Sequence, residues 1–415
     1  MKRWLSALAV NLCRVALGVT YVASGMSKAL DPAGMEHKVA AYLRNWDILL
    51  WTEGTAWLTA MVIVLAAIEF MLGMWLLIGM RRRLTTRLVT LFTAAFTILT
   101  IYIYIKEPVP DCGCFGDAVK LSHGETLLKN VVLLALCVPP LLRPLTIVRL
   151  IRRGSQWMPS LYAAAFVTAC GIYSSSYAPL VDFTSYVPGY SFNAAMEGKF
   201  GEKGIEDAFN FAVLDTAEND ITPNVTLGDG YTFLAIATNL GRTDRSVSDR
   251  IAEIHERAET TGEFRFYFLT ASDEAAWEKW KDATDATYHP CHTDEGVLHA
   301  AAKTDPGLLL LHADTIVGKW TKNNLPTITD RNNLPVPVQK LTQKPQKTGQ
   351  KLLKIAAWLF IPVLFLIFAD SLAAGTVTLR RRSLKRLARA RINQPATEHI
   401  ATEADSNNAE INQET

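Results

Sequence analysis

The chain has 415 residues, more than one ordinary domain needs, and a mean hydropathy of +0.13 with 49% hydrophobic residues. These values are high for a soluble protein and point first to insertion in a membrane. The formal net charge of +2 is too small to indicate a nucleic-acid partner, so the positions of the basic residues matter more than their number.

Six segments are long and apolar enough to cross a bilayer, which takes roughly 20 mostly apolar residues. The first begins after Lys2 and Arg3 but holds Arg14 inside its apolar run. That charge and the length of the run argue against a cleaved signal peptide, so we predict a retained first helix. The predicted spans cover residues 5–29, 56–80, 87–105, 124–142, 157–179 and 352–379.

Basic residues flank these spans unevenly. If every segment spans, the clusters at 81–87, 143–153 and 380–391 all fall on the side of the N-terminus, which is then cytoplasmic. The other side receives two short connections and a long polar insert, roughly residues 180–350. We therefore expect a multi-pass protein of a bacterial inner membrane, with both termini in the cytoplasm and the insert outside.

The first two spans each contain an ionisable residue. Counted from the cytoplasmic ends, Arg14 and Glu69 both lie roughly 15–16 Å deep. Because charges inside a membrane usually pair, we predict a contact between Arg14 and Glu69. We expect this contact to serve as a structural clasp and not in proton transfer, which stays the alternative. Lys28, near the outer end of the first helix, is either an interfacial lysine that reaches towards water or a charge that favours a thiolate in the nearby loop.

The connection before the fourth span reads "DCGCFGD" and holds Cys112 and Cys114. Outside the cytoplasm an oxidising environment permits a stable or cycling disulfide. Bending at Gly113 brings the two Cα atoms into the range of about 4.4–6.8 Å that a disulfide needs. The resulting ring is small, and we expect it to be easier to reduce than an ordinary structural bridge.

Other uses of this loop stay open. Two thiolates need further ligands to bind a metal, and the loop adds only Asp111, Asp117 and His123, a spacing that matches no standard zinc pattern. We therefore expect no metal there. A redox pair, a passive loop disulfide and inert thiols remain the alternatives.

Residues 5–142 resemble the DoxX-like membrane proteins, and more closely the MauE branch named for methylamine utilisation. The resemblance rests on Arg14 with Gly18, on "SGMSK" (24–28), on "IEFMLGMWLLIG" (68–79) and most specifically on "CGCFGD" (112–117). It implies a four-helix membrane bundle and a protein that helps a periplasmic partner acquire its disulfides. The chain departs from this pattern by its appended fifth span, polar insert and sixth span.

The polar insert alternates strand and helix patterns. Strands are predicted at 209–216, 231–238, 264–271, near Tyr288 and in a hairpin over 307–320. Helices are predicted at 245–261, 272–283 and 294–303. This order predicts an α/β domain with a mixed sheet.

The order of elements and the stretch "DPGLLLLHADTIVGKW" resemble thioredoxin-like proteins, with Pro306 as the cis-proline. Thioredoxin-like enzymes carry CxxC after the strand that corresponds to 231–238, but "NLGRTDR" follows here. The domain is therefore not expected to act as a dithiol oxidoreductase by itself, and partner or substrate recognition is its expected use. Its one thiol, Cys291, is either an ordinary loop thiol or a one-cysteine exchange partner.

The sequence thus predicts an α-helical membrane bundle joined to an extracytoplasmic thioredoxin-like domain. The linker between this domain and the sixth span is expected to be extended. The C-terminal tail is expected to begin as a basic helix on the inner leaflet and to end in a disordered segment. The predicted parts are the four-helix domain 1–153, the fifth helix 154–180, the thioredoxin-like domain 181–335, the linker 336–351, the sixth helix 352–379 and the tail 380–415.

Two classes of function follow. In the first, Cys112 and Cys114 relay disulfides between extracytoplasmic protein thiols and an acceptor, for which a membrane quinone is a candidate although the sequence requires no cofactor. In the second, the bundle anchors a partner-binding domain in the lipid bilayer and the cysteines only shape a turn. Small-molecule transport past Arg14 and Glu69 is a third candidate, without a broken-helix pattern to support it.

Overall fold

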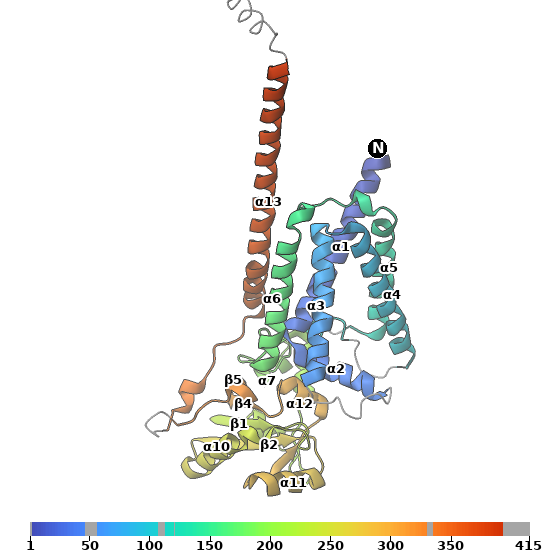
Figure 1. The fold of residues 1–415 in the computed structure, drawn as a ribbon. Helices are drawn as coiled ribbons and strands as arrows, with labels where there is room; N and C mark the ends of the chain where they lie inside the picture. The colour runs from blue at the N-terminus through green and yellow to red at the C-terminus, as the bar shows by residue number, and fades with distance from the viewer. Residues whose placement is uncertain (1, 46–55, 107–112, 120, 330–334, 393–415) are drawn as a thin grey trace, which may run out of the picture.

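The computed structural model describes residues 2–45, 56–106, 113–119, 121–329 and 335–392. A helical bundle forms one end of the molecule and an α/β domain the other (Figure 1). The N-terminus and the C-terminal part of α13 (Thr348–Ile392) lie at the end away from the sheet.

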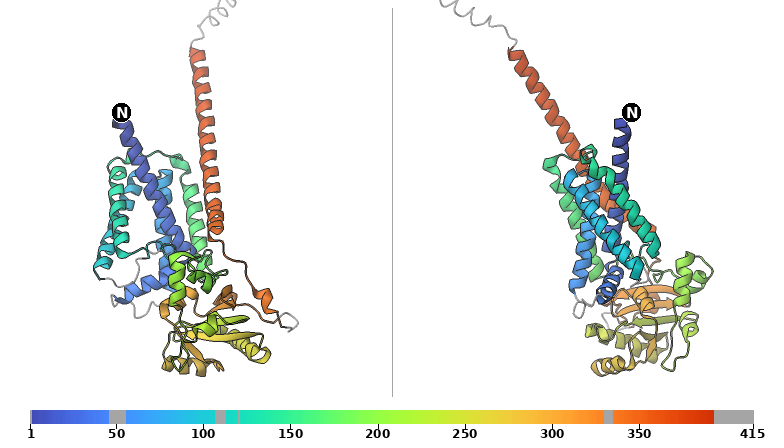
Figure 2. Two further views of the ribbon diagram at one scale, coloured as in Figure 1. Left: turned by 180° about the vertical axis from the view of Figure 1, so that it is seen from behind. Right: turned by 90° about the vertical axis from the view of Figure 1, so that its right-hand side faces the viewer.

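Within the described part of the chain, five helices are long and apolar enough to cross a membrane. They are Trp4–Leu30 of α1 (Lys2–Leu30), α3 (Ala56–Ile78), α4 (Arg82–Lys106), α5 (His123–Leu142) and Thr348–Thr376 of α13. The predicted span 157–179 forms α6 (Trp157–Ser176), which packs beside α3 in the same bundle (Figure 2). It is not among the five, because serine and tyrosine residues near both of its ends lower its hydropathy.

Glycines bring α1 and α3 into close contact. A Cβ atom on Gly25 would lie 2.5 Å from the backbone nitrogen of Phe70, and a Cβ atom on Gly73 would lie 2.7 Å from that of Val22. Small residues of this kind let helix backbones approach one another inside a membrane. The contacts also fix the register of these antiparallel helices.

Helix α2 (Pro32–Asn45) closes the end of the bundle that faces the sheet domain (Figure 1). It contacts α3 and α6 of the bundle, and it also contacts α12 (Glu295–Ala301) of the α/β domain. The two halves of the molecule therefore meet across α2.

The α/β domain is built on a five-stranded sheet in the order β3-β2-β1-β4-β5. The first three strands of this order run parallel, and β4 and β5 are antiparallel to their neighbours. The strands are β1 (Tyr231–Ile236), β2 (Phe264–Thr270), β3 (Pro290–His292), β4 (Gly307–His312) and β5 (Thr315–Thr321). Besides α12, the helices are α7 (Phe192–Met196), α8 (Gly201–Asn210), α9 (Thr222–Thr226), α10 (Ser248–Thr261) and α11 (Glu274–Thr284).

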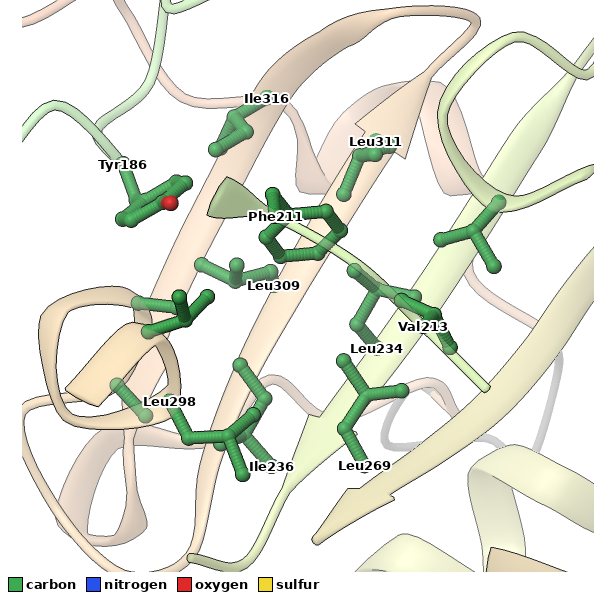
Figure 3. Packing of buried hydrophobic residues seen from close by; sticks show 14 of the residues in the cluster. Tyr186, Phe211, Val213, Leu234, Ile236, Leu269, Leu298, Leu309, Leu311 and Ile316 are labelled. Carbon is green, nitrogen blue, oxygen red and sulfur yellow. The ribbon is translucent and has the colours of Figure 1, made fainter. Parts of the chain in front are cut away.

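Alternating side chains of the central strands pack into two separate hydrophobic cores. Leu234 and Leu309 face a core shared with α7 and α12, which Figure 3 shows around Phe211. Phe233 and Leu308 face the opposite core, which is shared with α10 and α11. This period of two is the one expected for a sheet covered on both faces, and it produces a three-layer domain.

The structure confirms the predicted mixed α/β fold, and the peptide bond before Pro306 is cis. The predicted strand at 209–216 is wrong, because its first two residues belong to helix α8, which ends at Asn210. Only Leu214 pairs in this region, exchanging two backbone hydrogen bonds with His292 of β3. The apolar alternation of Phe211 and Val213 reflects burial in the core beside α7, after which a turn at Asp215 ends the extended stretch.

Candidate functional site

A buried polar cluster lies between α1 and α3, in contact with the loop that carries Cys114. The Lys28 ammonium lies 2.7 Å from a carboxylate oxygen of Glu69 and donates to the Cys114 carbonyl at 2.6 Å. The Ser24 hydroxyl lies 2.7 Å from the same carboxylate and 2.8 Å from the same carbonyl. Lys28 is 1% exposed and Glu69 4%, so both charges are removed from water and each depends on the other.

The predicted contact between Arg14 and Glu69 is therefore wrong. Depth counting assumed that α1 and α3 begin level at their basic ends, but Gly18 lies against Leu77. This register sets Arg14 beyond the end of α3, where it donates to the carbonyl of Val148. Glu69 lies about three helical turns further along the seam, level with Ser24 and Lys28.

The loop 113–119 lies on α2 as well as on α1. Gly113 has φ +62°, and a Cβ atom there would lie 2.8 Å from Cδ of Lys38. The Lys38 ammonium donates to the Gly116 carbonyl at 3.2 Å and pairs with Asp117 at 3.1 Å. The bare backbone of Gly34 leaves the room that the Asp117 carboxylate occupies. Both the backbone conformation and the nearby Lys38 side chain thus favour glycine at position 113.

The α/β domain binds the same loop through Lys303, which follows α12. Its ammonium lies 2.8 Å from a carboxylate oxygen of Asp31 and 3.0 Å from one of Asp117. Asp182, at 3.9 Å, also pairs with Lys319 of β5 at 2.6 Å. Lys303 and its three aspartates are buried or nearly so, and they come from four separate segments of the chain.

Charge pairing decides the ionisation of this network. Burial raises the pKa of Asp117, but the Lys303 and Lys38 ammonium groups outweigh it and hold that pKa well below its usual range. Burial disfavours the charge on Lys303, but its aspartate partners raise its pKa further than burial lowers it. Asp31 behaves differently, because burial raises its pKa more than Lys303 lowers it. The Lys319 and Lys303 ammonium groups likewise hold the pKa of Asp182 below its usual value against the effect of burial, so Asp117, Asp182 and Lys303 are all charged at neutral pH.

The edge of the sheet domain next to Lys303 also holds the turn after β1. Here Asp305, just before the cis-proline, accepts hydrogen bonds from the backbone nitrogens of Thr238 and Asn239 at 2.8 and 3.0 Å. Its carboxylate closes the turn after β1, where the sequence has no cysteine. Lys303 and Pro306 flank Asp305, so the cis-proline segment belongs to the same edge as the contact with the bundle.

The remaining predicted site cysteines are Cys112 and Cys291. Cys112 lies outside the described residues, so its pairing with half-buried Cys114 stays a prediction. Cys291 lies in β3 and not in a loop, 8% exposed in the core beside α12. Burial, with a smaller contribution from Asp215, raises the pKa of its thiol to about 11.

A small cavity of ≈ 50 Å³ adjoins the polar cluster. Its lining includes Tyr21, Phe96, Cys114 and Asn130, from α1, α4, the loop and α5. The space has room for a few water molecules at most. A quinone headgroup does not fit this space in the conformation described.

Sequence reasoning missed the lysine–aspartate network. Lys303 precedes the cis-proline in "AAKTDPG" and looks like an ordinary surface lysine. One signal in the sequence could have pointed to it. Asp31 and Asp117 end an apolar and a glycine-rich segment, where a buried carboxylate needs a cationic partner. Finding that cation required the three-dimensional approach of the two halves.

Residues 4–143 match the family model of methylamine utilisation protein MauE. Among solved structures the chain is similar to the thioredoxin domain of a thiol-disulfide oxidoreductase from Bacteroides vulgatus, with 14% identity, a TM-score of 0.22 and coverage of 26% of this chain and 81% of that one. It is also similar to a thiol-disulfide oxidoreductase from Bacteroides fragilis, with 13% identity, a TM-score of 0.23 and coverage of 26% and 86%. No curated protein matches the chain significantly. Residues 4–143 are therefore similar to the MauE family, and the chain adds to them an α/β domain with a five-stranded mixed sheet.

Proposed function

We propose that this protein relays disulfides to extracytoplasmic partner proteins through Cys112 and Cys114. The observation that carries the proposal is the double support of the cysteine loop. Lys28 and Ser24 bind its backbone at Cys114 from the bundle, and Lys303 binds Asp117 from the thioredoxin-like domain. A loop that served only as a turn between two helices would not need buried charges from both halves of the molecule.

The exchange needs both sulfurs. A thiolate of the partner attacks the Cys112–Cys114 disulfide and forms a mixed disulfide, releasing one loop thiolate. A second partner thiolate then displaces the loop sulfur, which leaves the partner oxidised and the loop as a dithiol. Two electrons and two protons pass from the partner to the loop, and a disulfide or another two-electron acceptor must reoxidise it.

The thioredoxin-like domain recognises the partner in this proposal. It has no cysteine after β1, so it does not compete for the disulfide. Its cis-proline segment contains Asp305 and Pro306 and adjoins Lys303, which holds the cysteine loop. A polypeptide bound along this edge would have its thiols close to the loop.

The proposal includes an orientation in which the loop and the thioredoxin-like domain face away from the cytoplasm. Support comes from the basic clusters at 81–87 and 380–391, which belong to the end of the bundle opposite the sheet (Figure 1). A membrane-impermeant maleimide added to intact, mildly reduced cells should label the loop cysteines. Labelling that appears only after lysis would overturn this orientation.

A non-catalytic role is the competing function, since an anchored binding domain would also have no CxxC. Redox titration of Cys112 and Cys114 separates the two. The loop should change between thiol and disulfide across thiol buffers that match the compartment, measured by gel shift in a protein with the other four cysteines replaced by alanine. A pair that stays fully reduced or fully oxidised throughout would support the binding module instead.

A second experiment identifies the partner. In cells that make the Cys114→Ala variant, the remaining Cys112 should retain a partner as a mixed disulfide, because no neighbouring thiol can resolve it. The double variant Cys112→Ala/Cys114→Ala is the matched control and should retain none. Equal capture by both variants would contradict exchange at this loop.

A further inference from the structure

A second cluster of chemically active side chains lies at the junction of the two halves, apart from the cysteine loop. His37 of α2 faces Glu295 and His299 of α12, and one ligand atom from each of the three lies within 4.8 Å of the others. The imidazole rings of His37 and His299 have their centroids 4.0 Å apart and are tilted by 36° to one another. The three residues have no part in the proposed disulfide exchange.

The spacing within α12 suits a metal ion. Glu295 and His299 are four residues apart, so they project from the same face of the helix. Nε2 of His299 lies 3.5 Å from a carboxylate oxygen of Glu295. Two ligands about 2.0–2.1 Å from a tetrahedral zinc ion are themselves roughly 3.3 Å apart. The pair on α12 therefore already stands near the separation that a shared ion requires.

His37 supplies the third ligand from the other half of the molecule. One of its ring nitrogens lies within 4.8 Å of the ligand atoms of Glu295 and His299. Two imidazoles and one carboxylate are a ligand set typical of zinc and of other divalent transition metals. Glu295 is exposed, so the fourth position of such an ion would be open to water.

We propose that His37, Glu295 and His299 bind a zinc-like divalent cation that joins α2 to α12. The ion would brace the thioredoxin-like domain against the helix whose residues Gly34 and Lys38 support the cysteine loop.

Cobalt absorption spectroscopy on the purified full-length protein tests the site. Because thiols also bind Co²⁺, the measurement uses a Cys112→Ala/Cys114→Ala background with an affinity tag free of histidine. This protein should bind one equivalent of Co²⁺ with the visible bands of a four- or five-coordinate ion, and Zn²⁺ should displace it. Absence of saturable binding at one equivalent would overturn the proposal.

Variants assign the ligands. His37→Ala should weaken binding about tenfold or more, whereas His312→Ala, which changes an exposed histidine outside the cluster, should leave it unchanged. His299→Cys keeps a ligand and should add a sulfur-to-cobalt charge-transfer band, which only direct coordination produces. Equal binding by the His37→Ala and His312→Ala proteins, or no new band with His299→Cys, would show that the three side chains only pack against one another.

Discussion

Lys28 of α1 and Glu69 of α3 form an ion pair of 2.7 Å inside the bundle, and the same ammonium group donates to the carbonyl of Cys114. The backbone of the cysteine loop is thus bound to a charge that has lost its contact with water. Because the close packing at Gly25 and Gly73 holds α1 against α3, it also holds the loop in place. Loop conformation and helix packing are therefore coupled.

Removal of either member of this pair should destabilise the bundle. Lys28→Met leaves a buried carboxylate without its cation, and Glu69→Leu leaves a buried ammonium, each at a cost of about 3–5 kcal/mol. The double variant should recover much of that loss, as measured by denaturant unfolding in detergent. Additive losses would contradict direct pairing. Arg14→Met combined with Glu69→Leu is the matched control and should be additive.

Lys303 should hold the thioredoxin-like domain on the bundle. Lys303→Met leaves Asp31, Asp117 and Asp182 without their shared cation, so the loop and α2 should become more exposed to solvent. Hydrogen exchange measured by mass spectrometry should accelerate in residues 113–119 and in α2. Lys199→Met removes an exposed ion pair with Glu197 and should change nothing. Unchanged exchange in both variants would show that other contacts maintain the docking.

The contribution of Asp117 should disappear in acid. Its folded-state pKa lies below the usual value of 3.8, so its charge stabilises the folded state fully above about pH 4 and progressively less as pH falls through the folded-state pKa. The difference in unfolding temperature between the parent and Asp117→Asn should be constant from about pH 5 to 7 and shrink below about pH 4. Asp31→Asn should not show this loss, because burial raises the pKa of Asp31. A difference for Asp117→Asn that widens in acid would refute the pairing.

Sequence patterns predicted the elements better than their contacts. The membrane helices and the strands at 231–238 and 264–271 follow from local periodicity, and the cis bond before Pro306 followed from resemblance. The ion-pair partner of Glu69 could not be predicted in this way. It depends on the register of α1 against α3, which the glycine contacts between these helices determine. Charge depth alone cannot locate that register.

The contact between the bundle and the α/β domain could not be predicted from local sequence patterns either. Lys303 meets carboxylates that lie 272, 186 and 121 positions earlier in the chain, at Asp31, Asp117 and Asp182. No periodic pattern connects such positions. The strand predicted at 209–216 failed for a different reason. Apolar residues do alternate there, but the alternation reflects burial in the core and not pairing with a neighbouring strand.

Two glycines of the cysteine loop provide a matched pair of substitutions. Gly113 and Gly116 both have positive φ, so alanine at either costs roughly 1–2 kcal/mol in backbone strain. Only at Gly113 does the new Cβ also meet Lys38, whereas nothing lies within 4 Å at Gly116. Gly113→Ala should therefore lower the unfolding temperature and the oxidised fraction of the loop more than Gly116→Ala does. Equal effects would mean that the contact with Lys38 places no demand on position 113.

Cys291 should take no part in thiol exchange. Burial in the core beside α12 raises the pKa of its thiol to about 11, so at pH 7 only about one molecule in ten thousand carries the reactive thiolate. Iodoacetamide at pH 7 should leave Cys291 unmodified in the folded protein and modify it after denaturation, as peptide mass spectrometry can show. Cys291→Ala should retain partner oxidation at the parental rate, whereas Cys112→Ser and Cys114→Ser should each abolish it. Rapid alkylation of Cys291 in the folded protein, or loss of activity in a stably folded Cys291→Ala variant, would require a second exchange site in the thioredoxin-like domain.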